Sequence, residues 1–379
     1  MIIGYDAKRI VRNRTGLGNY CRTLINALAP LASDDELLLY APDAGHDDLR
    51  RQVNSADNVR FVYPEGSKSR LQRNLWRRNG IIADLRRDHV DLFHGLTGEL
   101  PRGIRKTGIR TVVTIHDLIF LRHPEYYHWI DAQIYKYKFR QTLREADRII
   151  AISECTKRDI LEFGHYPADR IDVVYQSCST RFRTPLSPAM AEAVSKRYQL
   201  PDHFILNVGT IEERKNILLA VQALVHLPES LHLVVVGRPT KYMEKVDTYI
   251  YKAQLQTRVH FFANVDNDDL PAFYQRADCF IYPSRYEGFG IPIIEAIQSG
   301  LPVVAATGSC LEEAGGSDCL YVSPDSPDNL ANAITQMLPG AEFRAERIAR
   351  SQQYIRQFEN ADVAHRILEE YRKSLSLTL

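Results

Sequence analysis

The chain has 379 residues, which is longer than the roughly 250–300 residues at which one hydrophobic core stops growing, so we expect two domains. With 45% hydrophobic and 25% charged residues, its composition matches an average soluble globular protein and excludes disordered and fibrous classes. The net charge of +1, the scattered cysteines, and the lack of a signal-peptide pattern or bilayer-spanning apolar run predict a cytoplasmic protein with reduced thiols.

The first half of the chain alternates short apolar runs with helical patterns. We expect strands at residues 1–4, 36–40, 59–62, 91–93, 111–115, 148–152 and 171–174. This alternation is typical of a parallel sheet covered by helices on both faces. The sequence therefore predicts a doubly wound, Rossmann-like α/β domain over residues 1–185.

The alternation breaks at residues 176–200, which are rich in serine and proline and predict a linker. A second series then follows, with strands expected at residues 204–208, 231–236, 259–262, 279–282, 303–306 and 320–322. It predicts a second Rossmann-like domain over residues 186–358. The last segment, 359–379, has apolar residues at helical spacing and predicts a helix that could pack on either domain, including back on the N-terminal one.

A glycine-rich loop separates the first expected strand from the next helix. It contains Gly16 and Gly18, but Cys21 stands where a dinucleotide-binding fingerprint has its third glycine. Two interpretations stay open: the loop amides meet a donor phosphate or an acceptor, or the loop is a simple tight turn.

A histidine lies at the end of another expected strand. His116 follows the apolar run 111–115, and open α/β sheets bind ligands beyond the carboxyl ends of their strands. We therefore expect His116 to face a ligand, although a lone histidine is more often structural.

Two further motifs follow strands in the second half. After 204–208 come Gly209 and Thr210 and then the adjacent cations Arg214 and Lys215, which can neutralise a diphosphate. After 279–282 comes the run 286–296, which includes Pro292 near an expected helix start. A glycine turn before a helix N-terminus attracts phosphate, so this edge of the sheet predicts a nucleotide site.

Within the second motif, Glu287 and Glu295 are separated by seven residues that include Gly288, Phe289 and Gly290. This pattern resembles the retaining nucleotide-sugar glycosyltransferases of family four, which have the GT-B fold of two Rossmann-like domains facing each other across a cleft. The resemblance implies that Glu287 contacts the transferred sugar and that Glu295 binds the ribose hydroxyls.

The other motifs receive roles from the same resemblance. Arg214 and Lys215 are expected to clamp the donor pyrophosphate, and Thr210 departs from the family, where many members carry arginine. His116 is similar to a family histidine beside the reacting sugar, so it is expected on the donor sugar or the acceptor side. Gly16 and Gly18 match a family loop that faces the cleft.

The resemblance is greatest to bacterial mannosyltransferases of surface-polysaccharide assembly. It implies a hexosyltransferase of lipopolysaccharide or O-antigen assembly that uses GDP-mannose. No metal cofactor is expected, because Arg214 and Lys215 supply the positive charge that a metal would bring. The basic residues of 51–150, described below, predict a lipid-linked glycan as the acceptor. Two alternatives stay open: an NAD-type oxidoreductase, disfavoured by the missing third glycine, and a non-catalytic sugar-nucleotide-binding protein, which a broken glutamate pair would favour.

Charge is unevenly distributed, with 19 Lys and Arg against 11 Asp and Glu in residues 51–150. The basic residues cluster at Arg70, Arg73, Arg77 and Arg78 and again at Arg102, Arg105, Lys106 and Arg110. Together with the aromatic and basic run 126–138, they predict peripheral binding to the inner face of an anionic membrane, or else simply solvated surface. Nucleic acid is not expected as a partner because its motifs are absent.

One acidic run, 266–269, looks like the metal-binding triplet of the other glycosyltransferase fold. Since it precedes an expected helix, we interpret it as a helix cap, and no metal site is predicted.

Overall fold

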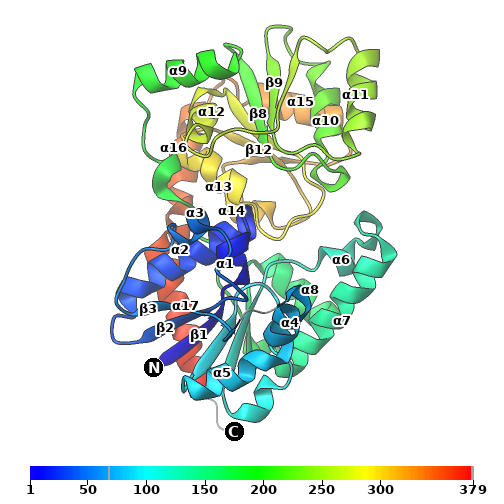
Figure 1. Cartoon of the computed structure of the whole chain (residues 1–379). Helices are drawn as coiled ribbons and strands as arrows, with labels where there is room; N and C mark the ends of the chain where they lie inside the picture. The colour runs from blue at the N-terminus through cyan, green and yellow to red at the C-terminus, as the bar shows by residue number, and fades with distance from the viewer. Residues whose placement is uncertain (67–68, 377–379) are drawn as a thin grey trace. The chain divides into compact units, whose positions relative to one another are not determined.

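The computed structural model describes residues 1–66 and 69–376 (Figure 1). The chain forms two compact units: Met1–Ser177 with the segment from Phe358 onward, and Cys178–Gln357. Each unit is a parallel sheet covered by helices, so the predicted α/β class with two doubly wound sheets is confirmed.

The sheet of the first unit has seven strands. They are β1 (Ile2–Asp6), β2 (Glu36–Tyr40), β3 (Val59–Val62), β4 (Leu92–Gly95), β5 (Arg110–Ile115), β6 (Arg148–Ala151) and β7 (Ile171–Val173). Their order is β3-β2-β1-β4-β5-β6-β7. Because helices cover both faces, most positions of the central strands are buried, and the strands are mostly apolar. The order reverses between β1 and β4, where open sheets bind ligands.

The helices of the first unit follow its strands in the sequence. They are α1 (Lys8–Arg12), α2 (Gly16–Leu31), α3 (Asp47–Arg50), α4 (Arg70–Leu75), α5 (Ile81–Arg87), α6 (Ile119–Arg122), α7 (Trp129–Glu145) and α8 (Glu154–Gly164). A π-helical turn, Trp76–Gly80, joins α4 to α5.

The last described helix, α17 (Asn360–Leu375), belongs to the first unit. Its residues Val363, Ile367 and Tyr371 lie at helical spacing in the same buried core as the apolar face of α2. Glu370, with its side chain 3% exposed, accepts a hydrogen bond from Nε of Arg148 in β6 at 2.9 Å. Apolar packing and a buried ion pair thus attach α17 to the first sheet, while residues 377–379 of the expected helix lie outside the described residues.

The sheet of the second unit has six strands. They are β8 (Phe204–Val208), β9 (His232–Val236), β10 (Val259–Phe262), β11 (Cys279–Tyr282), β12 (Val303–Ala306) and β13 (Leu320–Val322). Their order is β10-β9-β8-β11-β12-β13, again with parallel neighbours. The reversal lies between β8 and β11, so the loops after these two strands border the expected ligand crevice.

The helices of the second unit cover this sheet. They are α9 (Pro188–Tyr198), α10 (Ile217–Leu224), α11 (Met243–Lys252), α12 (Leu270–Arg276), α13 (Ile291–Gln298), α14 (Leu311–Gly315), α15 (Pro327–Thr335) and α16 (Arg344–Tyr354). The segment expected as a linker, 176–200, contains α9, which begins after the Ser187 cap with a proline in its first turn.

All thirteen strands that the sequence predicts are present, with ends that differ by at most two residues. The six cysteines are buried thiols, as expected. Within the described part of the chain, no helix combines the length and apolarity needed to cross a bilayer.

Candidate functional site

The loops after β8 and β11 lie at the strand-order reversal of the second sheet, and hydrogen bonds tie them together. The amide of Asn216 donates to the carbonyls of Pro283, at 3.2 Å, and Pro324, at 2.8 Å. The backbone amide of Arg285 donates to the carbonyl of Arg214 at 2.9 Å. The two sequence motifs, about 70 residues apart, therefore form one local structure at the carboxyl edge of the sheet.

This structure brings Arg214, Lys215 and Glu287 into direct contact. Nη1 of Arg214 lies 2.7 Å from Oε2 of Glu287, and Nζ of Lys215 lies 2.6 Å from Oε1. The side chains are only 15%, 16% and 11% exposed, respectively. Arg214 also donates to Glu212 at 2.7 Å and to the carbonyl of Tyr286 at 2.6 Å. The cluster is thus rigid and largely shielded from solvent.

The ion pairs determine the charge states in this cluster. Burial alone would raise the pKa of Glu287, but Lys215 and Arg214 outweigh it and lower the pKa to about 2. Burial lowers the pKa of Lys215, and the opposing effects of Glu287 and Tyr282 raise it above its ordinary value. Lys215 also donates to the Tyr282 hydroxyl at 2.6 Å. At neutral pH the site therefore presents two cations and a carboxylate that only accepts hydrogen bonds.

The turn from Glu287 into α13 depends on Gly290. This residue has φ of +128°, and a Cβ there would lie 3.1 Å from Leu311 and 3.3 Å from Ala314. Sγ of Cys310, which lies in none of the sequence motifs, is 3.1 Å from the carbonyl of Glu287 and 2.9 Å from that of Phe289. Gly288 lies between Glu287 and Phe289 in the sequence, so Cys310, the residue before α14, contacts the turn on both sides of Gly288.

Glu295 lies on α13, beside the same turn. Its Oε2 accepts a hydrogen bond from the Tyr274 hydroxyl at 2.8 Å, and burial raises the pKa of its carboxyl group.

Gly209, after β8, donates its backbone amide to the carbonyl of Val236 at 2.9 Å, and Thr210 beside it is half-buried. The amide of Gly209 is therefore used by the protein itself.

His116 belongs to the first unit, where it follows β5. Its Nε2 lies 2.8 Å from the carbonyl of Leu96, and its Nδ1 lies 2.8 Å from Nε2 of Gln176, which places the proton on Nε2 of His116. Burial lowers the pKa of His116 to about 4, and Tyr20 packs edge-on against the ring at 4.7 Å. Because both nitrogens have protein partners, this side chain is a positioned neutral group, poorly placed to exchange a proton.

Gly16 and Gly18 lie in the first turn of α2, and the loop before them ends at Thr15. A Cβ on Gly18 would lie 2.0 Å from the carbonyl oxygen of Asn13, and its amide donates to Oδ1 of Asn13 at 3.0 Å. Gly18 therefore allows a close chain approach, whereas open space surrounds Gly16.

Two of the arginines expected on a basic surface are engaged inside the first unit. Arg77 forms ion pairs with Asp6 and Glu99, and Arg73 lies 2.9 Å from Asp43. Arg77 lies in the π-helical turn after α4. Arg77 is only 17% exposed in its ion pairs, whereas Arg73 is 33% exposed, so membrane binding through this cluster stays a prediction.

The capping interpretation of residues 266–269 is wrong in its side-chain detail. Asp269 occupies the cap position of α12, but its carboxylate makes no capping hydrogen bond. Instead it accepts from Arg197 at 2.6 Å and from Tyr198 at 3.0 Å, and the carbonyl of Asp266 receives the first amides.

Comparison with known proteins identifies the family. Residues 192–354 match the model of glycosyl transferases group 1, and residues 14–181 match that of glycosyltransferase family 4. The chain belongs to the group 1 and family 4 glycosyltransferases. The glycosyltransferase is 29% identical to O-antigen chain mannosyltransferase B of Escherichia coli over 94% of this chain and 96% of the relative. It is 24% identical to O-antigen chain mannosyltransferase RfbU of Salmonella typhimurium over 89% and 92% of the two chains.

Solved structures show the GT-B fold across nearly the whole glycosyltransferase. Anabaena HepE in complex with UDP and glucose has a TM-score of 0.73 at 19% identity and covers 98% of this chain and 99% of its own. Sucrose-phosphate synthase from Thermosynechococcus elongatus has a TM-score of 0.78 at 19% identity, covering 98% of each chain. The predicted family, fold and enzyme class are confirmed, and the chain is a glycosyltransferase similar to enzymes of O-antigen mannosyl transfer.

Proposed function

We propose that this glycosyltransferase transfers mannose from GDP-mannose to a hydroxyl group of a lipid-linked glycan, with retention at the anomeric carbon and without a metal. The observation that carries the proposal is the cluster of Arg214, Lys215 and Glu287 at the strand-order reversal of the second sheet. Two cations there supply the positive charge that a departing diphosphate needs. The similarity to named O-antigen mannosyltransferases supports mannose as the sugar.

In this proposal the ion pairs exchange partners when the donor binds. Arg214 and Lys215 turn from Glu287 to the diphosphate, and the released carboxylate accepts a hydrogen bond from a sugar hydroxyl. Charge develops on the diphosphate as the bond to the anomeric carbon breaks, so the cations stabilise the transition state more than the ground state. Their positive charge replaces that of a divalent metal.

The remaining residues position the donor and the acceptor. Glu295 binds the ribose hydroxyls, and the turn of Gly288, Phe289 and Gly290 places backbone next to the donor at the start of α13. Gly209 and Thr210 lie in the loop after β8 and contact the donor from there. In the first unit, His116 and Gly16 border the acceptor side, with His116 acting through its position and not through proton transfer.

The test is a reaction followed by NMR with GDP-mannose and a mannose-terminated oligosaccharide on a short-chain lipid diphosphate. We expect a mannoside with the anomeric configuration of the donor and no product from the Glu287→Gln variant. A product of inverted configuration would contradict retention. Transfer from UDP-glucose at a higher kcat/KM than from GDP-mannose would contradict the donor assignment.

A lipid-linked acceptor implies that the enzyme works at a membrane, and α7 has the surface for it. Ile130, Ile134 and Tyr137, at i, i+4 and i+7, are 64%, 47% and 54% exposed, and the adjacent Trp129 is 75% exposed. Basic residues flank this apolar stripe: Lys136, Lys138 and Arg140. An exposed apolar face with cations beside it suits the interface of an anionic bilayer, so we propose peripheral cytoplasmic membrane binding through α7.

Vesicle co-sedimentation separates the apolar and charged contributions of α7. The Ile130→Ser and Ile134→Ser double variant should lose binding to anionic vesicles, whereas Leu71→Ser, an exposed apolar residue on α4, should not. Binding should fall with salt because charge contributes on the order of 1 kcal/mol per cation near the surface. Equal recovery with neutral and anionic lipids would refute the proposal.

A further inference from the structure

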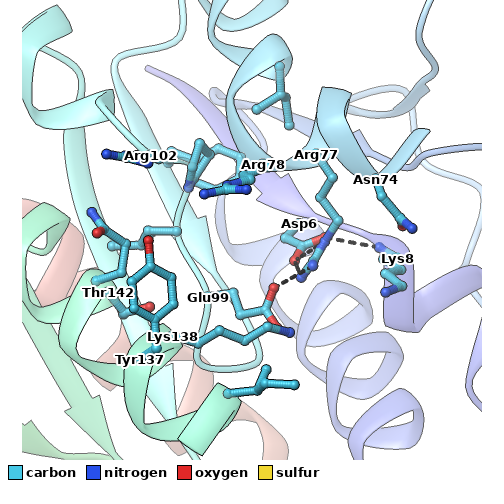
Figure 2. Close-up of a pocket in the computed structure, with 16 residues that line it drawn as sticks. Asp6, Lys8, Asn74, Arg77, Arg78, Glu99, Arg102, Tyr137, Lys138 and Thr142 are labelled. Atoms are coloured by element: carbon cyan, nitrogen blue, oxygen red, sulfur yellow. Dashed lines mark hydrogen bonds and ion pairs between the residues drawn. The ribbon is translucent and has the colours of Figure 1, made fainter. Parts of the chain in front are cut away.

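The first unit contains a pocket of about 490 Å³ that is lined by none of the residues assigned above to the donor or, like His116 and Gly16, to the acceptor side. Its volume is that of a site for a small organic ligand. Asp6 and Phe93 come from β1 and β4, Glu99 follows β4, and Tyr137 and Thr142 come from α7 (Figure 2). The pocket thus lies at the strand-order reversal of the first sheet, the position that corresponds to the Arg214 and Lys215 cluster in the second.

A rigid ion-pair network forms one wall of this pocket. Nε of Arg77 lies 3.0 Å from Oδ2 of Asp6, and Arg77 also pairs with Glu99 (Figure 2). Lys138 reaches the second oxygen of Glu99 at 3.0 Å. The charges of these paired groups neutralise one another, so the network fixes the shape of this side of the pocket. The other cations of the lining therefore determine the charge of the ligand that the pocket binds.

Three further cations line the pocket and form no direct ion pair with a carboxylate among the described residues: Lys8, Arg78 and Arg102. The backbone amide of Arg102 donates to the carbonyl of Arg78 at 2.7 Å, so the backbones of these two residues are adjacent. Burial, with the nearby charge of Arg77, lowers the pKa of Lys8 and outweighs the opposite effects of Glu99 and Asp6. An anion in the pocket would relieve this unfavourable positive charge.

The apolar part of the lining connects the pocket with the exposed face of α7. Ile134 and Tyr137 belong both to the pocket and to the apolar stripe of that helix. A ligand with an anionic group beside an apolar chain would place its charge among the cations and its chain along α7. Few soluble metabolites combine these two parts, whereas a lipid phosphate does.

We propose that this pocket binds the phosphate or diphosphate group of the acceptor, held by Arg78, Arg102 and Lys8. This inference rests on the proposed glycosyl transfer and adds to it a binding site for the acceptor phosphate. The cations bind the phosphate, while the hydroxyl that receives the sugar lies further along the acceptor. The same phosphate chemistry occurs in lipid-carried diphosphates and in soluble sugar phosphates, and titration with both kinds of compound distinguishes them.

The test is calorimetric titration of the full chain with inorganic pyrophosphate, farnesyl diphosphate and mannose 1-phosphate. All proteins carry Lys215→Gln, which weakens diphosphate binding at the donor cluster. In this background, Arg78→Gln with Arg102→Gln is compared with Arg86→Gln and Arg158→Gln, which make the same charge change at exposed positions of the first unit away from the pocket.

We expect the pocket variant to bind farnesyl diphosphate about 100-fold more weakly than the control, because each charge-assisted hydrogen bond to the phosphate contributes about tenfold in affinity. Equal affinity in the two variants would overturn the proposal. Tighter binding of farnesyl diphosphate than of mannose 1-phosphate identifies a lipid-carried acceptor, and the reverse order identifies a soluble one; both support a phosphate site.

Enzyme kinetics separates this inference from the proposed function. With Lys215 intact, the pocket variant should raise the KM for the acceptor and leave the affinity for GDP-mannose unchanged. If the parent protein binds farnesyl diphosphate through Arg78 and Arg102 but neither binds nor uses a nucleotide sugar, the proposed function fails and the phosphate site stands.

Discussion

Replacing Glu287 by glutamine removes one charge and keeps the shape of the side chain, so it tests the ion-pair cluster directly. The variant leaves Arg214 and Lys215, only 15% and 16% exposed, without their shared carboxylate. Removing one partner of a buried ion pair costs about 3–5 kcal/mol. The pKa of about 2, against an ordinary 4.5, independently corresponds to about 3 kcal/mol of free energy of unfolding at neutral pH.

For a unit of this size, about 3 kcal/mol corresponds to a fall of about 6–12 °C in Tm, measured by calorimetry at pH 7. Glu212→Gln is the matched control, because its 37% exposed side chain pairs with Arg214 alone and should contribute less than about 1 kcal/mol. The pKa of Glu287 is lowered by folding, so its contribution is complete above pH 4.5 and is lost as the pH falls toward 2. A Tm for Glu287→Gln that equals that of Glu212→Gln would refute the ion-pair account.

Three further outcomes follow from the charges and their burial. EDTA should leave the initial rate of transfer within about twofold, because Arg214 and Lys215 supply the charge of a metal; loss of activity that magnesium or manganese restores would count against this. Glu370→Gln should lower the free energy of unfolding of the first unit by about 3 kcal/mol in urea titrations, whereas the exposed neighbour Glu369→Gln should change it by less than about 0.5 kcal/mol. Burial lowers the pKa of His94 to about 3 and that of His116 to about 4, so their contribution to the free energy of unfolding should be complete above pH 6.5 and decrease below it. The His116→Gln variant should lose less stability than the parent as the pH falls. An equal loss in the variant and the parent would contradict the buried neutral state of His116.

The strands and the two sheets were predictable because each buried strand is an apolar run of the length that a covered parallel strand needs. The run 279–282, for example, is bounded by Asp278 and Pro283 and matches β11 without error. Because the glutamate motif follows this strand, the sequence also predicted that the motif would lie at a ligand-binding edge of the sheet.

The partners of individual charges were not predictable. The sequence analysis assigned Arg77 to a basic surface, but Arg77 forms ion pairs with Asp6 and Glu99. The pairing of Glu287 with both cations joins loops about 70 residues apart, so no local sequence pattern predicts this pairing. One signal was available: Asp6 ends a strand just before a helix, and the strand-end rule that selected His116 applies to it equally.

The contact between the donor diphosphate and Lys215 is the central claim of this account, and the affinity for GDP-mannose measures it directly. Isothermal titration of the parent chain is compared with Lys215→Gln and with Lys245→Gln, a 61% exposed lysine of the same unit. The account predicts that Lys215→Gln weakens the binding of GDP-mannose by about tenfold or more, while Lys245→Gln leaves it unchanged. Equal affinity in Lys215→Gln and the parent would contradict it.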